Sequence, residues 1–232
     1  MWLCNSSVGR KVVMSVTGIA LVLFLTFHMA MNLVAIISPE GYNLVCEFLG
    51  ANWYALIATA GLAFLVVVHL VYAFWLTMQN RTARGTERYA VVEKPKTVEW
   101  ASQNMLVLGI IVLVGMGLHL FNFWYNMQWP EILHKMGCVA VDTTYVADGV
   151  YHIENTFANP VYSVLYLIWL AALWFHLTHG FWSSLQTLGW SNKIWFERWK
   201  CTSNIYTTIV VLGFALVVIV YFVKSLSCGA TC

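Results

Sequence analysis

Five long stretches of this chain contain no charged side chain, and they limit the possible folds more than any other feature. The gaps between successive charged residues hold 28, 33, 31, 38 and 23 positions, and they begin after Lys11, Glu47, Glu99, Glu154 and Lys200. A helix of about 20 apolar residues spans the hydrocarbon core of a bilayer. Each gap therefore accommodates one membrane-spanning helix and is too short for two.

Because only helices and closed barrels satisfy their backbone hydrogen bonds in lipid, we expect an all-α membrane protein with one membrane-spanning domain over residues 1–232. The five transmembrane helices are predicted at residues 12–37, 53–79, 101–126, 160–188 and 204–226. They are joined by a short loop around Pro39–Gly41, a basic loop at 80–100, a long outer loop at 127–158 and a loop at 189–203. The first helix is too long for a cleaved signal peptide, whose apolar run is about 7–15 residues.

The composition agrees with a membrane protein and excludes several other classes. Apolar residues make up 60% of the chain and charged residues 9%, whereas a soluble domain has about 45–50% and 25%. These values exclude a soluble single domain and a disordered chain. A nucleic-acid-binding protein is excluded as well, because it needs a clustered basic surface.

Basic residues are divided unequally between the two sides of the predicted bundle. Ten of the twelve fall on the side of the N-terminus and of the loops at 80–100 and 189–203, namely Arg10, Lys11, Arg81, Arg84, Arg88, Lys94, Lys96, Lys193, Arg198 and Lys200. Only Lys135 and Lys224 fall on the other side. Since cytoplasmic loops are enriched in Lys and Arg, we expect the N-terminus in the cytoplasm. An odd number of helices then places the C-terminus outside.

Five histidines lie inside the predicted helices, and their depths suggest pairs. His28 lies 18 residues after Arg10 and His119 lies 20 residues after Glu99, which is roughly 27–30 Å from the cytoplasmic side. His69 lies 12 residues from its bounding residue, roughly 18 Å deep, and helix four offers His176 or His179 near that level. A buried histidine could also be a structural hydrogen bond between helices. Two pairs at two depths nevertheless predict two bis-histidine sites.

Paired imidazoles without thiolates or carboxylates favour a six-coordinate haem over zinc, which prefers four protein ligands. The second N–H of each ligand is expected to donate to the carbonyl four residues earlier, in Phe24, Leu65, Gly115 and Ala172. Gly115 and Gly117 are expected to leave room for the cofactor beside His119. The six cysteines form no metal-binding cluster. Four are predicted on the outer side, either as disulfides or as free thiols: Cys46, Cys138, Cys228 and Cys232.

The ordered set of motifs resembles the five-helix, dihaem cytochrome b subunit of succinate:quinone oxidoreductases, that is, of succinate dehydrogenase and quinol:fumarate reductase. The motifs are Ser7-Val-Gly-Arg-Lys11 with Thr17-Gly18, Phe27-His28-Met-Ala-Met-Asn32, Val68-His69-Leu-Val-Tyr72, Leu118-His119-Leu120 and Phe175-His176-Leu-Thr-His-Gly-Phe-Trp-Ser183. The likeness extends over nearly the whole chain. It implies that four helices enclose two b haems.

The resemblance assigns the candidate iron ligands. It implies that His28 and His119 bind the distal haem, and that His69 and a helix-four histidine bind the proximal one. The register of the helix-four motif selects His176 as the ligand. His179 is then expected to reach a haem propionate or a polar neighbour on the cytoplasmic side.

The function implied by the resemblance is that of a membrane anchor. It would relay electrons between an iron–sulfur subunit, itself bound to a flavoprotein subunit, and menaquinone near the outer face of a bacterial cytoplasmic membrane. The chain carries no flavin or iron–sulfur motif, so it would not act on succinate or fumarate by itself. Whether the complex forms a dimer of heterotrimers is left open by the sequence.

Two acidic positions bear on proton transfer. Glu47, expected at the start of helix two, is a candidate for quinone proton exchange or else a solvated surface acid. Some family members carry a Glu two residues before the helix-four ligand, where this chain has Trp174, so the sequence gives no support for that proton route.

Two alternative functions remain. One is the dihaem anchor of another respiratory oxidoreductase, such as a hydrogenase or formate dehydrogenase, although related designs place two ligands on one helix. The other is a cofactor-free transporter with a histidine proton relay.

Overall fold

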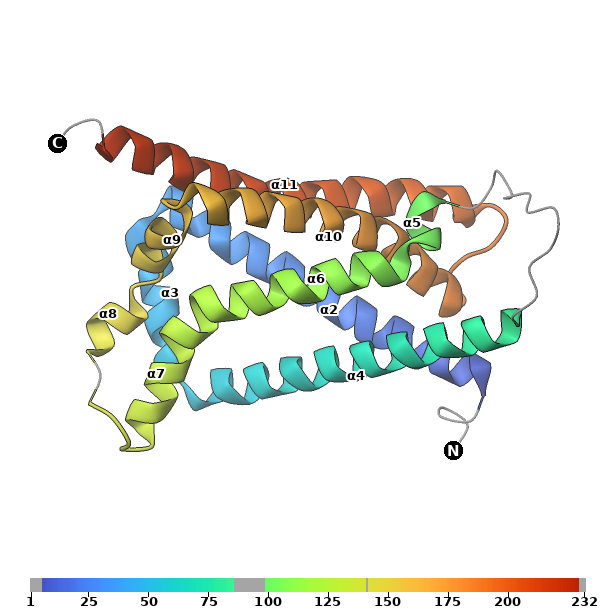
Figure 1. Ribbon diagram of the computed structural model, residues 1–232, viewed down its shortest axis with the longest axis horizontal. Coiled ribbons are helices and arrows are strands. Elements are labelled where there is room, and N and C mark those ends of the chain that lie inside the picture. The colour runs from blue at the N-terminus through green and yellow to red at the C-terminus, as the bar shows by residue number, and fades with distance from the viewer. Residues whose placement is uncertain (1–5, 86–98, 141, 230–232) are drawn as a thin grey trace. The chain divides into compact units, whose positions relative to one another are not determined.

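The computed structural model describes residues 6–85, 99–140 and 142–229, and these contain helices, turns and no strand (Figure 1). Within these ranges, five helices are long and apolar enough to cross a membrane: Ser7–Ile37, Trp53–Ala83, Met105–Lys135, Pro160–Thr187 and Trp195–Ser227. The prediction of five membrane-spanning helices is confirmed. This is the pattern of a multi-pass membrane protein.

The long helices are α2 (Ser7–Ile37), α4 (Trp53–Arg84), α6 (Met105–His119), α10 (Pro160–Thr187) and α11 (Trp195–Gly229). A π-helical turn, η1 (Leu120–Trp124), joins α6 to α7 (Tyr125–Lys135). The short helices are α3 (Pro39–Ala51), α5 (Trp100–Gln103), α8 (Thr143–Ala147) and α9 (Gly149–Phe157).

Two segments predicted as loops are largely helical, and in each case a helix cap explains the difference. The short loop at Pro39–Gly41 is the first turn of α3, because the Ser38 hydroxyl accepts a hydrogen bond from the Gly41 N–H at 3.1 Å. The long loop at 127–158 contains most of α7 and all of α8 and α9. Asp148 caps α9 by accepting from the Tyr151 N–H at 2.9 Å. Capping side chains set helix starts independently of apolar content.

The two cytoplasmic loops of the prediction are also shorter than expected. The Asn192 side chain accepts a hydrogen bond from the Trp195 N–H at 2.9 Å, and α11 begins at Trp195 instead of near residue 204. On the other side, α4 continues to Arg84. The basic residues expected at the centre of the 80–100 loop lie outside the described residues: Arg88, Lys94 and Lys96.

The chain divides into two compact units. Unit 1 comprises Met1–Phe24, Ala60–Ile110 and Trp174–Thr208, and unit 2 comprises Leu25–Thr59, Ile111–Leu173 and Ile209–Cys232. Each long helix contributes one end to each unit, and the short helices α3, α7, α8 and α9 belong to unit 2. Of the ten basic residues predicted on the cytoplasmic side, the seven within the described residues all belong to unit 1.

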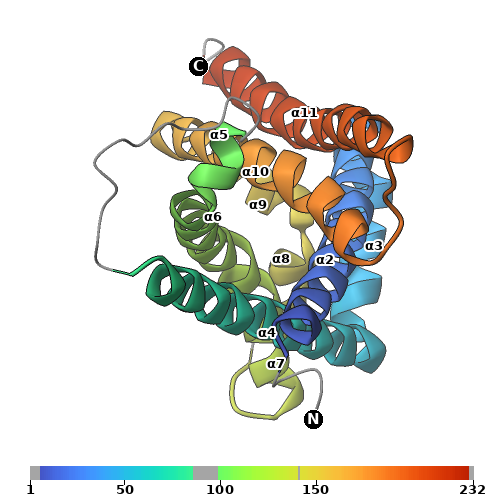
Figure 2. The same cartoon turned by 90° about the vertical axis from the view of Figure 1, so that its right-hand side faces the viewer.

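In unit 1, small polar side chains join α11 to α10, which lie side by side (Figure 2). The Ser203 hydroxyl, which is fully buried, donates to the Thr178 carbonyl at 3.1 Å. The indole of Trp174 donates to the Thr208 hydroxyl at 2.9 Å. Such hydrogen bonds are typical of helix pairs in membranes. Packing an apolar side chain against another helix gains little there, because lipid tails are equally apolar.

In unit 2, α11 contacts α2. The buried phenol of Tyr221 donates to the Ala35 carbonyl at 2.7 Å. A Cβ added at Gly213 would lie 2.6 Å from the sulfur of Met29, so the glycine allows this close approach. The short helices α3 and α9 are joined by Asn43, whose amide donates to Asp148 at 2.8 Å and accepts from the Val150 N–H at 3.0 Å.

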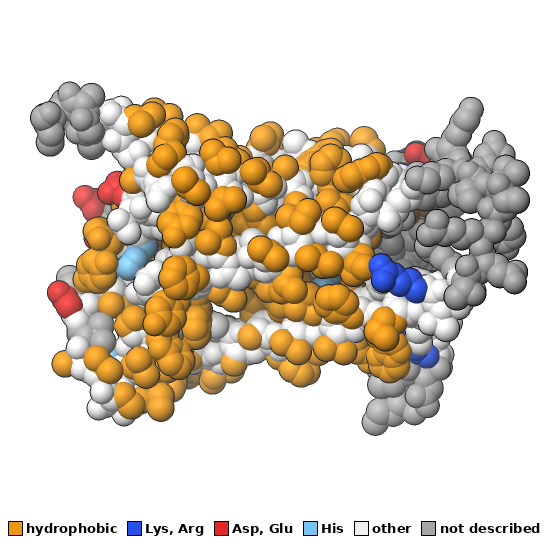
Figure 3. Space-filling model, viewed as in Figure 1, with side chains coloured by type: hydrophobic (Ala, Val, Ile, Leu, Met, Phe, Trp, Pro, Cys, Tyr) orange, Lys and Arg blue, Asp and Glu red, His pale blue; other side chains and the backbone are white. Residues whose placement is uncertain are grey.

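Large apolar side chains cover the exposed faces of the long helices (Figure 3). Leu23, Val114 and Ile209, for example, are 65%, 68% and 60% exposed. Charged side chains in this view occur only toward the helix ends. Surfaces of this extent and composition are incompatible with water and suit lipid.

Candidate functional site

His28 of α2 and His119 of α6 face one another in unit 2. Their ring centroids are 5.7 Å apart and the ring planes are at 85°. Two imidazole nitrogens bound on opposite sides of one metal ion lie about 4 Å apart. The centroids of the two imidazole rings are then about 6 Å apart. The separation therefore fits two axial ligands of a single iron. The structure brings together the outer pair that helix depth predicted.

Aromatic side chains surround this pair. The ring centroids of Phe123 and Trp169 lie 5.1 Å and 5.8 Å from that of His119, and Phe214 lies 5.7 Å from His28. The Trp169 indole is held in place because it donates to the Val112 carbonyl at 3.0 Å. An aromatic shell of this kind excludes water and provides flat surfaces against which a planar macrocycle can pack.

The role expected for Gly115 is wrong in one respect. A Cβ at this position would overlap the indole ring of Trp169, so the glycine makes room for a neighbouring side chain of the protein. At Gly117, by contrast, an added Cβ would meet nothing within 4 Å. Of the two glycines expected to leave room beside His119, only Gly117 adjoins open space.

In unit 1, the imidazole of His69 is oriented by Thr17 of α2. The Thr17 hydroxyl donates to the Val13 carbonyl at 2.9 Å, and its oxygen lies 3.1 Å from Nδ1 of His69. The hydroxyl can donate to the Val13 or the Met14 carbonyl of its own helix, and the tautomer of His69 that suits this arrangement donates Nδ1–H to the threonine oxygen. The other nitrogen, Nε2, then carries a lone pair, which is the state a metal ligand requires. Thr17, and not the expected Leu65 carbonyl, fixes this ring.

His176 of α10 lies in the same unit, close enough to His69 for the two rings to interact electrostatically. Its Nδ1 is buried and has no hydrogen-bond partner among the described residues, so the expected bond to the Ala172 carbonyl is not formed. A buried polar atom left unpaired costs about 1–3 kcal/mol. This imidazole would therefore gain from a bound partner.

Glycines lie against the imidazoles of His69 and His176 in unit 1. A Cβ added at Gly18 of α2 would lie 3.5 Å from Cε1 of His69, and one at Gly109 of α6 would lie 3.6 Å from Cε1 of His176. Any larger side chain at these positions would fill the space beside the rings. His69 and His176 thus offer two imidazole nitrogens as ligands, together with the clearance that a planar cofactor needs.

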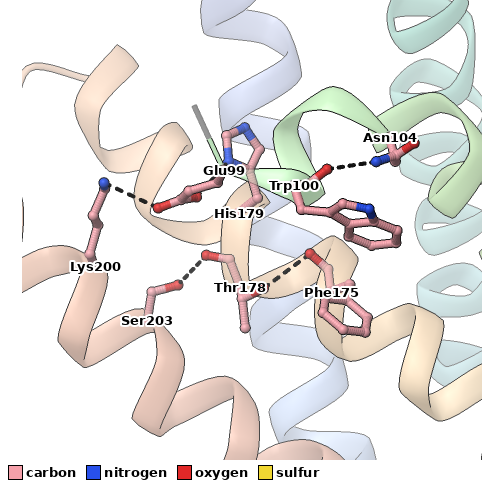
Figure 4. A network of polar contacts seen from close by, with 8 residues as sticks. All are labelled: Glu99, Trp100, Asn104, Phe175, Thr178, His179, Lys200 and Ser203. Carbon is pink, nitrogen blue, oxygen red and sulfur yellow. Dashed lines mark hydrogen bonds and ion pairs between the residues drawn. The ribbon is translucent and has the colours of Figure 1, made fainter. Parts of the chain in front are cut away.

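His179 is engaged elsewhere (Figure 4). Its Nδ1 lies 3.2 Å from one carboxylate oxygen of Glu99, and the other oxygen lies 3.1 Å from the Lys200 ammonium. Partial burial raises the pKa of Glu99, but the hydrogen bonds and positive charge of His179 and Lys200 outweigh it, so the pKa is lowered. The polar neighbour expected for His179 is therefore Glu99, at the N-terminal end of α5.

The donor set itself limits what either pair could bind. No group of three or more His, Cys, Asp or Glu side chains able to hold a metal ion occurs within residues 6–85, 99–140 and 142–229. A metal at either pair must therefore take its remaining ligands from a non-protein group. A haem supplies four equatorial nitrogens and needs two axial ligands, which matches two imidazoles. The residues present fit this cofactor.

Glu47 does not begin the second long helix. It is an exposed residue of α3, and α4 begins six residues later at Trp53. The break is at Asn52, which has an extended backbone and whose side chain accepts from the Tyr54 N–H at 2.9 Å. Glu47 is also not among the residues that line the pocket of unit 2.

His152 falls within the long outer loop predicted at 127–158, and no role was predicted for it. In the structure it is only 4% exposed and lines a pocket of unit 2. The signal in the sequence is Asp148, a capping residue at the start of a helix. A helix beginning at Gly149 places His152 and Thr156, four residues apart, on one face.

Of the cysteines expected outside, Cys46 and Cys138 are free thiols in the structure. Burial raises the pKa of the Cys46 thiol to about 11. Cys232 and the side chain of Cys228 lie outside the described part of the chain. The two alternatives predicted for them, a disulfide or free thiols, therefore stay predictions.

Comparison of the chain with protein-family models, with curated proteins and with solved structures found no match. A functional assignment therefore depends on the chemistry of the residues themselves. The residues that carry it are His28 and His119 in unit 2, and His69 and His176 in unit 1.

Proposed function

We propose that the chain is a membrane-embedded cytochrome b with two haem groups. His28 and His119 would hold the distal haem, and His69 and His176 would hold the proximal haem. The observation that carries this proposal is the opposed pair in unit 2, whose ring centroids are 5.7 Å apart on two different apolar helices. Titratable side chains at membrane depth are costly and are functional by default.

When bound, a haem ligated by two imidazoles supplies one-electron transfer without an open position for substrate. The residues of the chain hold and orient it. Thr17 keeps the lone pair of His69 available, and Gly18 and Gly109 leave clearance beside the rings. In unit 2, Phe123 and Trp169 pack beside the ring of His119.

The choice of His176 over His179 is supported by the surroundings of His176. Nδ1 of His179 lies 3.2 Å from the Glu99 carboxylate, whereas the buried Nδ1 of His176 has no partner among the described residues. This contact engages only Nδ1 of His179, so the choice rests on two features of His176: its ring interacts electrostatically with that of His69, and Gly109 leaves clearance beside it.

The larger assembly is proposed from the motifs. The ordered histidine motifs resemble the anchor subunit of succinate dehydrogenase and fumarate reductase. This proposal adds an iron–sulfur subunit, a flavoprotein subunit and menaquinone as partners, in a bacterial cytoplasmic membrane with the N-terminus inside. Support comes from the seven described basic residues of unit 1, which suit a cytoplasmic face. Aromatic residues under basic ones, such as Trp75 under Arg10 at 4.8 Å, are typical of a membrane interface.

The haem proposal is tested on the purified chain by pyridine haemochrome analysis and a reduced-minus-oxidised spectrum. We expect two b haems per chain. His28→Ala or His119→Ala should remove one, His69→Ala or His176→Ala the other, and His179→Ala should keep both. A chain without b-type absorption contradicts the proposal and favours the histidine-relay transporter.

The assembly is tested separately by affinity purification of the chain from its own membranes under mild detergent. We expect a flavoprotein and an iron–sulfur protein to copurify in equal amounts. Copurification of hydrogenase or formate dehydrogenase subunits instead would keep the cytochrome and change the complex.

A further inference from the structure

The turn between α10 and α11, which joins two membrane-spanning helices (Figure 1), displays large apolar side chains. α10 ends at Thr187, α11 begins at Trp195, and the turn belongs to unit 1. Trp190 and Ile194 are 64% and 67% exposed, and Trp195 is 43% exposed. Tryptophan is enriched at the level of the lipid headgroups, where spanning helices end. The turn therefore suits the headgroup region of a bilayer.

The backbone of the turn is fixed from both sides. Gly189, with φ of 85°, follows the end of α10, and its N–H donates to the Gln186 carbonyl at 3.1 Å. The Trp190 N–H donates to the Leu185 carbonyl at 3.0 Å, which completes the usual closure of a helix by glycine. From α11, the Trp199 indole donates to the Trp190 carbonyl at 2.9 Å. The exposed side chains thus project from an ordered backbone, which lowers the entropic cost of binding a ligand.

A cation lies over one of the exposed indoles. The guanidinium carbon of Arg198 is 5.2 Å from the ring centroid of Trp195, and the ring of Trp199 is 5.4 Å from that of Trp195. The three residues share one face of α11, because side chains three and four residues apart on a helix are neighbours. Arg198 is exposed and forms no ion pair with a carboxylate of the described residues. Its N–H groups remain available for an anion, and their planar arrangement matches a phosphate.

Lys193 is a second available cation in the turn. It is exposed and likewise has no ion pair within the described part of the chain. By contrast, the ammonium of Lys200 on the same helix lies 3.1 Å from the Glu99 carboxylate. Between residues 188 and 199 the sequence holds one acid, Glu197, against the two cations. The surface therefore combines an excess of positive charge with exposed indoles.

The backbone N–H groups at the start of α11 do not supply the anion site. The Asn192 side chain accepts from the N–H groups of Ile194 and Trp195, both at 2.9 Å. A ligand must therefore use the side chains. A soluble anion would pair with the cations and leave the indoles in water, whereas a phospholipid offers a phosphate to the cations and a glycerol and acyl body to the indoles.

We propose that Lys193, Arg198 and Trp195 bind the headgroup of an anionic phospholipid. The guanidinium of Arg198 donates to the phosphate, and Lys193 adds a second positive charge. A zwitterionic lipid carries a cationic group as well, which the two cations repel, and the ring face of Trp195 under Arg198 is not free to hold it. A basic side chain near the membrane surface favours anionic lipid roughly fivefold. The site does not depend on the presence of haem.

The proposal is tested by counting bound lipids. The full chain, purified in detergent with the subunits that accompany it, is titrated with phosphatidylglycerol and with phosphatidylcholine of the same acyl chains, and complexes are resolved by native mass spectrometry. We expect the first phosphatidylglycerol to bind roughly five- to thirtyfold more tightly than phosphatidylcholine. Glycerol phosphate, which has the anionic headgroup without acyl chains, should not displace it at equal concentration.

Variants assign the preference to these side chains. Lys193→Gln together with Arg198→Gln should abolish it, and each single change should weaken phosphatidylglycerol binding roughly fivefold. Trp195→Leu, which removes the ring under Arg198, should weaken it roughly two- to fivefold. The matched control is Lys11→Gln together with Arg81→Gln, which removes two exposed cations of the same unit and should leave the tightest site unchanged.

Equal binding of the two lipids to the wild type overturns the proposal, and so does a preference that persists without Lys193 and Arg198 or falls equally in the control. Displacement by glycerol phosphate would show a site for a soluble anion instead of a lipid. If the double change at Lys193 and Arg198 prevents folding, the two single variants decide. Loss of the accompanying subunits from the variant, with an unchanged lipid preference, would show that a protein covers this surface and would also overturn the proposal.

Discussion

Thr17 and His69 are joined across two helices by a hydrogen bond of 3.1 Å between the threonine oxygen and Nδ1 of the imidazole. The hydroxyl also bonds its own helix, through the Val13 carbonyl at 2.9 Å. The imidazole of one helix is thus oriented by the backbone of another. Any change in the packing of α2 against α4 within unit 1 would change the direction of the His69 lone pair.

Removing this hydroxyl should weaken the proximal site. Thr17→Val keeps the shape of the side chain but leaves Nδ1 of His69 without its acceptor. Loss of such an orienting partner lowers metal affinity by about 10–100-fold. We expect reduced occupancy of one haem and a shift of its midpoint potential, measured by haem titration and redox potentiometry. Thr17→Ser, which keeps the oxygen, should resemble the wild type; equal affinity in Thr17→Val would contradict the role assigned to Thr17.

The space beside His176 should be needed for cofactor binding. Gly109→Leu would place a branched side chain where a Cβ already comes within 3.6 Å of the ring. We expect haem content to fall from two to one per chain, with the distal haem retained. Gly61→Leu is the control in the same unit, because an added Cβ there meets nothing within 4 Å. Two haems in Gly109→Leu would show that the clearance is not used.

Gly115 and Gly117 should differ sharply although they lie two residues apart on α6. A Cβ at Gly115 overlaps the Trp169 indole, whereas at Gly117 it meets nothing within 4 Å. Overpacking of this kind costs about 1–3 kcal/mol. We therefore expect Gly115→Ala to lower the melting temperature, followed by tryptophan fluorescence, and Gly117→Ala to leave it unchanged or raise it slightly. Similar melting curves for the two variants would mean that Trp169 moves freely.

The Glu99 network should make stability depend on pH. Because the pKa of Glu99 is lowered from its usual 4.5, the ionised carboxylate favours the folded state. Its contribution is present above pH 4.5 and is lost as the pH falls through the lowered pKa. Since the carboxylate is partly exposed, the contribution should stay below about 1 kcal/mol.

Thermal melting of Glu99→Gln at several pH values tests this. The variant should be less stable than the wild type at pH 7, and the difference should shrink as the solution is acidified. Glu197→Gln, which changes an exposed acid of α11, should show no such trend. A constant difference between wild type and Glu99→Gln at all pH values would rule out a role for ionisation.

Much of the fold could be predicted because a bilayer imposes a length. Uncharged stretches of at least 23 residues left no alternative to five spanning helices, and counting along them paired His28 with His119. Helix rotation could not be predicted in this way. Lipid-facing and interior positions are both apolar, so periodicity does not reveal that Thr17 faces His69 or that Trp169 occupies the space at Gly115.

The segments outside the long helices were predicted least well. The prediction of these segments relied on their apolar content. The starts of α3, α9 and α11 are instead set by one capping side chain each, from Ser38, Asp148 and Asn192. Overlooking α9 also concealed His152. Its burial requires a helix at that position, and the composition of the segment resembles that of an ordinary polar loop.

Because η1 is a π-helical turn, the number of residues in this segment determines how the residues that line the pocket of unit 2 are oriented. It follows His119 directly, and the side-chain amide of Asn126, just beyond it, donates to the Phe121 carbonyl at 3.0 Å. Each residue of an α-helix turns the chain by about 100°. A homologue with a one-residue deletion here could regularise the helix and keep His119 in register, yet it would swing Asn126 and all that follows around the axis. In such a lineage the histidine pairs would be kept while the lining of the pocket was rearranged, without a single substitution in it.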